Sequence, residues 1–213
     1  MATVLYITAN PHDHEKSYSM LVGNEFIQSY RSTNPYDEVI HLDLYKVDIP
    51  QLDKDVFSGW DKLRAGLAFE QLTEAEIVKL SSMNELVDQF VEADKYVFVT
   101  PIWNYSYPPV LKSYIDCICI VGKTFRYVPD IGRVGLLSEK KAVHIQASGS
   151  FLSPGSDDED LEMGHRHLKI IMDFVGVPTF EGIFVEGMAK NPEQEPAIKE
   201  KAIQQAREVA QRF

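Results

Sequence analysis

Residues Tyr96-Val97-Phe98-Val99-Thr100 form a short run of aromatic and β-branched side chains that ends at Pro101. A run with no charged interruption favours a strand buried on both faces, because neither face is suited to water. Four further short and largely apolar runs are bounded by turn residues, at 4–8, 39–44, 142–147 and 180–185. The sequence therefore predicts five strands.

Segments with the periodicity of amphipathic helices separate these runs. They cover residues 19–31, 73–93, 108–121, 161–176 and 196–212, so one helix follows each predicted strand. This alternation is typical of a parallel sheet with helices on both faces. Five strands are too few for an eight-stranded barrel. We therefore expect an α/β fold with an open, doubly wound parallel sheet in the flavodoxin-like strand order 2-1-3-4-5.

The chain of 213 residues is long enough for one substantial core, and no repeat, low-complexity tract or flexible linker divides it. We expect a single domain over residues 1–213. One long connection, at about 47–72, is expected to be irregular and carries apolar side chains such as Phe57 and Trp60. It is either a lid or dimer contact, or a loop whose aromatic side chains pack on its own helix.

The composition narrows the classes of function. With 21 basic and 32 acidic residues, the chain has a formal net charge of −11, which opposes binding to nucleic acid and to anionic membrane surfaces. Residues 1–7 lack the basic start of a signal peptide, and no apolar stretch is long enough to span a bilayer. The two cysteines, Cys117 and Cys119, are poorly spaced for a disulfide. These features predict a cytoplasmic protein with reduced thiols.

Two pairs of histidines could in principle bind a metal ion: His12 with His14, and His165 with His167. Residues two apart on a helix do not face each other, and the loop pair has no nearby carboxylates and cysteines to complete a ligand set. We therefore expect solvated histidines and no metal site. The two cysteines likewise lack the C-x-x-C spacing of a redox dithiol.

In an open parallel sheet, ligands bind outside the carboxyl ends of the strands, near the point where the strand order reverses. The loops after the first, third and fourth predicted strands are therefore the candidates for a site. The first loop, 10–19, ends in Ser17-Tyr18-Ser19 before a helix, where hydroxyls and unpaired backbone N–H groups favour a phosphate. It lacks the glycine patterns of dinucleotide and triphosphate sites, so a monophosphate is expected. The alternative is that Ser17 or Ser19 only caps the helix.

The second loop, 101–109, combines three aromatic side chains with Asn104 and a proline that can start a helix. Aromatic walls bury a planar heterocycle, and an amide can both donate to and accept from an imide edge. The alternative is a set of core aromatics at a helix start. The third loop, Ala147-Ser148-Gly149-Ser150, has small residues that let backbone N–H groups approach a ligand, although alone it would be only a turn. Together the three loops predict one pocket.

Several motifs resemble those of the FMN-dependent NADH-azoreductase and NADH:quinone oxidoreductase family, and the resemblance extends over essentially the whole chain. The motifs are Ser17-Tyr18-Ser19, Pro101-Ile102-Trp103-Asn104-Tyr105, Leu111-Lys112-Ser113-Tyr114-Ile115-Asp116 and Gly122-Lys123-Thr124-Phe125-Arg126-Tyr127. The resemblance implies a flavodoxin-like homodimer in which each protomer holds one tightly bound, non-covalent FMN and the active sites lie at the subunit boundary. It also implies that NADH is the electron donor and that quinones and azo compounds are the acceptors.

The resemblance also implies which residues bind FMN. These are Asn10, Ser17, Tyr18, Ser19, Pro101, Ile102, Trp103, Asn104, Tyr105, Ala147, Ser148, Gly149 and Ser150. The phosphate is expected at 17–19, the isoalloxazine ring at 102–105 and its pyrimidine side at 147–150. The family often has serine in place of Asn10 and Ser-Arg-Gly-Gly in place of 147–150, but an amide and small residues still permit binding. Tyr127 is expected either on the substrate side or as a packed core tyrosine.

The flavin is expected to carry the chemistry, with no catalytic side chain. A hydride passes from NADH to flavin N5, and a quinone or azo acceptor then takes the two electrons in a ping-pong cycle. One alternative is a flavodoxin-type FMN electron carrier that does not oxidise NADH directly. A receiver-like signalling domain would need acidic residues after strands one and three, where this chain has Thr8-Ala9-Asn10 and Thr100-Pro101. A paralogue that keeps the fold without flavin is a further alternative.

Overall fold

The computed structural model describes residues 1–213 and contains a five-stranded parallel sheet in the order β2-β1-β3-β6-β7. Its strands are β1 (Thr3–Thr8), β2 (Glu38–Asp43), β3 (Lys95–Pro101), β6 (Lys141–Ser148) and β7 (Thr179–Glu186). Every neighbouring pair in this sheet is parallel. Counted over these five strands alone, the order is 2-1-3-4-5. The predicted strands, their order and the α/β fold class are therefore confirmed.

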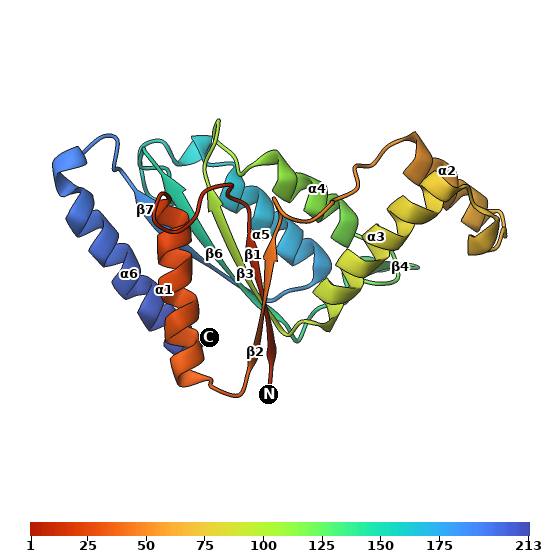
Figure 1. Cartoon of the computed structure of the whole chain (residues 1–213), viewed down its shortest axis with the longest axis horizontal. Coiled ribbons are helices and arrows are strands. Elements are labelled where there is room, and N and C mark those ends of the chain that lie inside the picture. The colour runs from red at the N-terminus through yellow and green to blue at the C-terminus, as the bar shows by residue number, and fades with distance from the viewer.

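Six α-helices surround the sheet. They are α1 (Tyr18–Thr33), α2 (Lys54–Arg64), α3 (Glu74–Glu92), α4 (Pro109–Ile118), α5 (Gly164–Val175) and α6 (Glu195–Arg212). Figure 1 shows α1 and α6 side by side on one face of the sheet and α3, α4 and α5 on the other. Side chains of β1 pack on both faces of the sheet. Val4 and Tyr6 pack toward α1 and α6, whereas Leu5 and Ile7 pack toward the helices on the opposite face. The core is therefore two apolar layers separated by the sheet.

The connection at 47–72 is not irregular, so that expectation was wrong. It contains α2 and a short 3-10 turn, Phe69–Gln71. The carboxylate of Asp53 starts α2, because it accepts two backbone N–H groups of the first turn at 3.0 and 3.2 Å. An ion pair then ties α2 to α3, with 2.6 Å between Lys62 Nζ and Glu76 Oε1, and it lowers the pKa of Glu76 to about 2.

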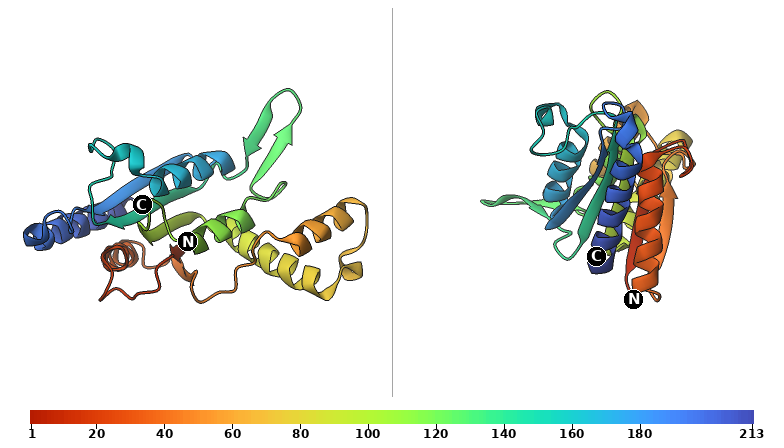
Figure 2. Two further views of the ribbon diagram at one scale, coloured as in Figure 1. Left: turned by 90° about the horizontal axis from the view of Figure 1, so that it is seen from above. Right: turned by 90° about the vertical axis from the view of Figure 1, so that its left-hand side faces the viewer.

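A β-hairpin that the sequence reasoning missed follows α4. It consists of β4 (Phe125–Val128) and β5 (Gly132–Gly135), which pair in antiparallel fashion. The connection has a positive φ angle of 64° at Asp130, and Gly132, the first residue of β5, has one of 90°. A short run with a turn signal at Pro129-Asp130 was the available indication. Figure 2, left, shows the hairpin projecting beyond the sheet at the same end of the molecule as α2 and α3.

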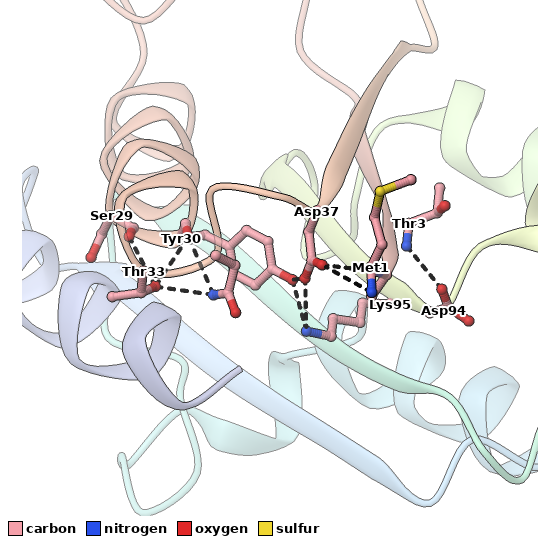
Figure 3. Close-up of polar contacts among 10 residues, drawn as sticks. Met1, Thr3, Ser29, Tyr30, Thr33, Asp37, Asp94 and Lys95 are labelled. Atoms are coloured by element: carbon pink, nitrogen blue, oxygen red, sulfur yellow. Dashed lines mark hydrogen bonds and ion pairs between the residues drawn. The ribbon is translucent and has the colours of Figure 1, made fainter.

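The amino ends of the strands are held by a polar network around Asp37 (Figure 3). Its carboxylate accepts the Tyr30 hydroxyl at 2.6 Å and the backbone N–H of Ala2 at 2.7 Å, and Lys95 Nζ lies 3.8 Å away. The bond from Tyr30 is the main cause that holds the pKa of Asp37 below its usual value. These groups satisfy one another, so this edge of the sheet is structural and the opposite, carboxyl edge is the candidate for a site.

Candidate functional site

A cleft of about 480 Å³ opens at the carboxyl edge of the sheet, which is the upper edge in Figure 1. The loops that follow β1, β3, β6 and β7 line it. Nine of the predicted site residues are among its lining: Asn10, Ser17, Tyr18, Pro101, Ile102, Trp103, Ala147, Ser148 and Gly149. Its volume is in the range of cofactor and small-molecule sites. The three predicted loops therefore do meet in one cavity.

Five predicted residues lie outside the lining of the cleft: Ser19, Asn104, Tyr105, Ser150 and Tyr127. Ser19 is buried directly behind Ser17, with 3.1 Å between their hydroxyl oxygens. Tyr127 lies on β4, away from the cleft, and is 68% exposed. The alternative that Tyr127 is a packed core tyrosine is therefore wrong.

Four residues that the sequence did not assign to this site also line the cleft: His12, Lys16, Met188 and Ala189. The position of Lys16 directly before the helix cap was a usable signal, because a cation beside unpaired N–H groups strengthens an anion site. Met188 and Ala189 follow β7, and neither side chain carries a hydrogen-bonding group that would mark it as a ligand contact.

One end of the cleft is the amino terminus of α1. Ser17 is the N-cap, and its hydroxyl oxygen accepts the backbone N–H of Met20 at 3.4 Å. The backbone N–H groups of Tyr18 and Ser19 donate to no group of the protein. Free N–H groups, the positive end of the helix dipole and the ammonium group of Lys16 together suit a phosphate.

A second wall is the loop after β6, which is tied to the loop after β7. The backbone N–H of Ala189 donates to the Gly149 carbonyl at 3.1 Å, and that of Gly187 donates to the Ser148 carbonyl at 3.2 Å. A Cβ at Gly149 would lie 3.0 Å from the Cβ of Ala189, which explains the glycine there. The N–H groups of Gly149 and Ser150 have no partner in the protein, so they are free to donate to a ligand.

A third wall is the turn from Trp103 to Ser106, which two backbone bonds of 2.7 and 3.1 Å close. Asn104 and Tyr105 adopt positive φ angles of 51° and 68°, the left-handed region that a bulky residue rarely occupies. The Tyr105 carbonyl accepts the N–H of Met163 at 2.9 Å, which holds the turn against the segment before α5. Trp103 is thereby fixed beside the cleft with 41% of its surface exposed.

The expectation of solvated histidines was wrong for His165 and His167. The His165 ring stacks parallel to that of buried His144, with 3.2 Å between the two Nδ1 atoms, and His144 Nε2 lies 3.0 Å from Thr100 Oγ1. Burial lowers the pKa of both stacked rings, that of His165 to about 4. His167 bonds to the hydroxyl of Tyr107. No group of histidine, cysteine and acidic side chains is arranged to hold a metal ion.

Comparison with known proteins gives consistent matches over the whole chain. The family model described as a flavodoxin-like fold matches residues 2–210. An FMN-dependent NADH:quinone oxidoreductase of Geobacillus kaustophilus (strain HTA426) is 58% identical, over 100% of both chains. The crystal structure of an azoreductase from Bacillus anthracis str. Sterne superposes with a TM-score of 0.92 at 35% identity, also over 100% of both chains. An FMN-dependent NADH-azoreductase from Bacillus anthracis str. Ames Ancestor, solved in complex with FMN, has a TM-score of 0.91 at 32% identity and covers 100% of this chain and 99% of its own. The chain therefore belongs to the flavodoxin-like family of FMN-dependent NADH:quinone oxidoreductases and azoreductases.

Proposed function

We propose that the protein is an FMN-dependent NADH:quinone oxidoreductase that also reduces azo compounds. The observation that carries the proposal is that two walls of one cleft carry free N–H groups. Tyr18 supplies one at the first wall, with the free N–H of Ser19 directly behind it, and Gly149 supplies one at the second wall, next to the free N–H of Ser150. Such donors suit a ligand with an anionic end and a hydrogen-bonding planar end. FMN has both, and the names of the relatives identify it as their cofactor.

The amino end of α1 would hold the FMN phosphate. Ser17, Tyr18 and Ser19 supply the helix terminus, and Lys16 adds a positive charge beside it. Asn10 lies behind Ser17 and supports its hydroxyl, with 2.7 Å from its Nδ2 to Ser17 Oγ. The chain has no arginine in the lining of this cleft, so backbone dipoles and Lys16 carry the attraction.

The other two walls would hold the isoalloxazine ring. Ile102 and Trp103 give it an apolar surface, and a 2.8 Å bond from the Ile102 N–H to the Ala147 carbonyl keeps two of the walls at a fixed spacing. Gly149 and Ser150 would donate backbone N–H groups to its pyrimidine side. Asn104 and Tyr105, at the turn beyond Trp103, remain predicted contacts at the outer part of the ring.

The protein's own contribution to the reaction is binding and orientation. When bound, FMN supplies a centre that takes a hydride from NADH and passes two electrons to a quinone or azo acceptor. The free N–H groups of Gly149 and Ser150 would stabilise negative charge on a ring bound beside them. The exposed part of Trp103 offers a flat surface on which NADH and then the acceptor can align. No catalytic side chain is required.

Flavin spectroscopy tests this function. We expect the purified protein, loaded with FMN and dialysed, to retain flavin whose visible absorbance NADH bleaches anaerobically and a quinone or azo dye restores. Retained flavin that NADH does not reduce would instead indicate an electron carrier. If no flavin is retained, the assignment of the cleft as a cofactor site is wrong.

We also propose that the protein is a homodimer, with α2 and the β4–β5 hairpin at the subunit contact. A second cavity of about 460 Å³ next to α2 has an almost entirely apolar lining: Phe57, Trp60, Leu63, Arg64, Cys119, Ile120 and Val121. Phe57 is 51% exposed, Val121 61% and Ile131, at the hairpin tip, 73%. Exposed apolar side chains of this kind favour burial against another protein surface. The same contact would bring Tyr127 to the substrate side of the partner's site.

Sedimentation equilibrium tests the dimer. We expect the wild-type protein to sediment as a dimer and Val121→Glu to weaken self-association at least about tenfold, because a charge would be buried in an apolar contact. Val78→Glu is the control, because Val78 is also exposed (60%) but lies on α3 outside the lining of that cavity. A monomeric wild type, or equal effects of the two variants, would contradict this contact.

We propose a cytoplasmic location. The thiols of Cys117 and Cys119 are free, and burial raises their pKa values to about 12 and about 11, so neither is poised for disulfide exchange. No helix combines the length and the apolar character needed to cross a membrane. Cell fractionation tests the proposal, and recovery of the protein outside the cytoplasmic fraction would refute it.

A further inference from the structure

Asn10 lines the end of the cleft proposed to hold the phosphate and is 5% exposed. The backbone N–H of His12 donates to Asn10 Oδ1 at 2.9 Å, which fixes the orientation of the side-chain amide because only the oxygen can accept. The amide nitrogen therefore faces two hydroxyls. It lies 2.7 Å from Ser17 Oγ and 3.5 Å from Ser19 Oγ.

The cluster of Asn10, Ser17, Ser19 and the Met20 N–H contains more donor hydrogens than hydroxyl lone pairs. Ser17 Oγ accepts from Asn10 and from the backbone N–H of Met20, and it bonds to Ser19 Oγ at 3.1 Å. Asn10 brings two hydrogens, Met20 one, and the two hydroxyls one each, whereas the hydroxyl oxygens offer only two lone pairs apiece. One hydroxyl hydrogen is therefore left without an acceptor inside the cluster.

The role of the Ser17 hydroxyl in this cluster is fixed. Both lone pairs of Ser17 Oγ are taken by N–H donors, so the Ser17 hydroxyl can act only as a donor. Ser17 lines the cleft, whereas Ser19 is fully buried behind it. Inside the cluster the acceptor of the Ser17 hydrogen is Ser19 Oγ, 3.1 Å away. An acceptor placed in the cleft at the amino end of α1 would take this hydrogen in place of Ser19 Oγ without breaking either bond that Ser17 Oγ accepts.

We propose that Asn10 is a positioning residue that makes the Ser17 hydroxyl an obligate donor and thereby selects a phosphate monoester at this end of the cleft. The inference rests on the proposed FMN site and adds to it how this chain recognises the phosphate. An amide at position 10 differs from a hydroxyl, because its NH₂ group can only donate, whereas a hydroxyl can either donate or accept. Asn10 need not touch the phosphate to have this effect.

The test compares FMN with riboflavin, which has the same ring and lacks the phosphate. We expect Asn10→Asp to raise the Kd for FMN about 50-fold, because a carboxylate accepts the Ser17 hydrogen and adds a negative charge beside the phosphate. Asn10→Ala is expected to raise it about tenfold, because it removes the donor without adding charge. The Kd for riboflavin should change by less than about twofold in both variants.

A double mutant tests whether Asn10 acts through Ser17. In a Ser17→Ala background, Asn10→Ala is expected to change the FMN Kd by less than about twofold, because the hydroxyl that it orients is absent. Circular dichroism melting checks that each variant is folded. Asn10→Ala is the milder change, and it alone is sufficient if Asn10→Asp does not fold.

Two results would overturn the inference. One is an equal loss of FMN and riboflavin affinity in Asn10→Ala, which would mean that Asn10 only maintains the shape of the loop. The other is an unchanged FMN affinity. A failure of the proposed function looks different, because the wild-type protein would then bind neither flavin or would bind FMN that NADH does not bleach.

Discussion

Acidification from pH 7 to about pH 4 is expected to remove about 3 kcal/mol of folding free energy through His165 alone. The ring packs against both His144 and Phe180, with ring centroids 5.4 and 4.8 Å away. Burial is the main cause that lowers its pKa to about 4 from an ordinary value of 6.5, and Glu162 opposes the shift in part. The native protein therefore keeps this ring neutral at a pH where the unfolded chain protonates it.

The sign and the pH window follow from that difference. Below about pH 6.5 the unfolded chain binds a proton that the folded chain does not, so stability falls as the pH falls. The loss through His165 is complete once the pH is below about 4. His144 acts in the same direction, since burial and the neighbouring ring hold its pKa well below the ordinary value. The Glu76 carboxylate, whose pKa is about 2, loses its stabilising effect only at lower pH.

Urea unfolding at several pH values between 7 and 4.5 measures the effect. His165→Gln keeps an amide that can donate to His144 but does not titrate, so the pH slope should fall by about 1.4 kcal/mol per pH unit. His14→Gln is the control, because His14 is exposed in the loop before α1 and the replacement should leave the wild-type profile unchanged. Parallel stability profiles for wild type and His165→Gln would show that this histidine is not the source of the acid sensitivity.

The histidine pair also shows what the sequence could not reveal. His165-x-His167 reads as part of a polar helix face, and nothing near it in the chain indicates contact with His144. The contact exists because β6 and α5 are adjacent in the fold and Phe180 on β7 completes the enclosure. Tertiary packing of this kind decides whether a histidine is solvated or buried, and local periodicity carries no information about it.

The strands of the sheet were predictable because each is an apolar run between turn residues. Helix α2 was not, because Ser58-Gly59 in its centre favours a loop when the sequence is taken alone. In the structure Gly59 allows α2 to approach α3, since a Cβ there would lie 2.7 Å from Leu80 Cδ1. The glycine thus lies at a close contact between the two helices, and the charged groups of Asp53 and Lys62 hold α2 in place.

The site residues that could be predicted are those whose residue type suits ligand binding and whose place in the sequence is directly after a predicted strand. Ser17 and Gly149 follow strands at or next to the switch in strand order, and each is of a residue type suited to bringing hydrogen-bond donors to a ligand. Met188 and Ala189 line the same cleft because backbone bonds tie their loop to the loop after β6. Their part in the site depends on the pairing of β6 with β7, and their side chains give no sign of it.

Replacement of Gly135 by alanine is expected to lower the free energy of unfolding by about 3 kcal/mol. Gly135 ends β5 where the hairpin meets the carboxyl end of α5. A Cβ there would lie 2.3 Å from the backbone nitrogen of Gly176 and 2.4 Å from the carbonyl carbon of Val175. Backbone atoms cannot rotate away as a flexible side chain can, so the hairpin and the helix end must separate.

Separating the hairpin from the end of α5 also weakens two other interactions. The Leu137 N–H donates to the Val175 carbonyl at 3.0 Å, and the Phe125 and Phe174 rings pack with centroids 4.5 Å apart. Both interactions join the hairpin to α5, and both must lengthen to admit a methyl group. We therefore expect hydrogen exchange to accelerate at the amide of Leu137 in Gly135→Ala, in addition to the global loss of stability.

Gly132 provides a matched control at the other end of the same strand. It has a positive φ of 90°, and a Cβ there would meet nothing within 4 Å. Gly132→Ala should therefore cost only about 1 kcal/mol, the penalty for the left-handed conformation, and should leave exchange at Leu137 unchanged. If urea unfolding gave equal losses for the two variants, the close contact between Gly135 and Gly176 would not be what anchors the hairpin to α5.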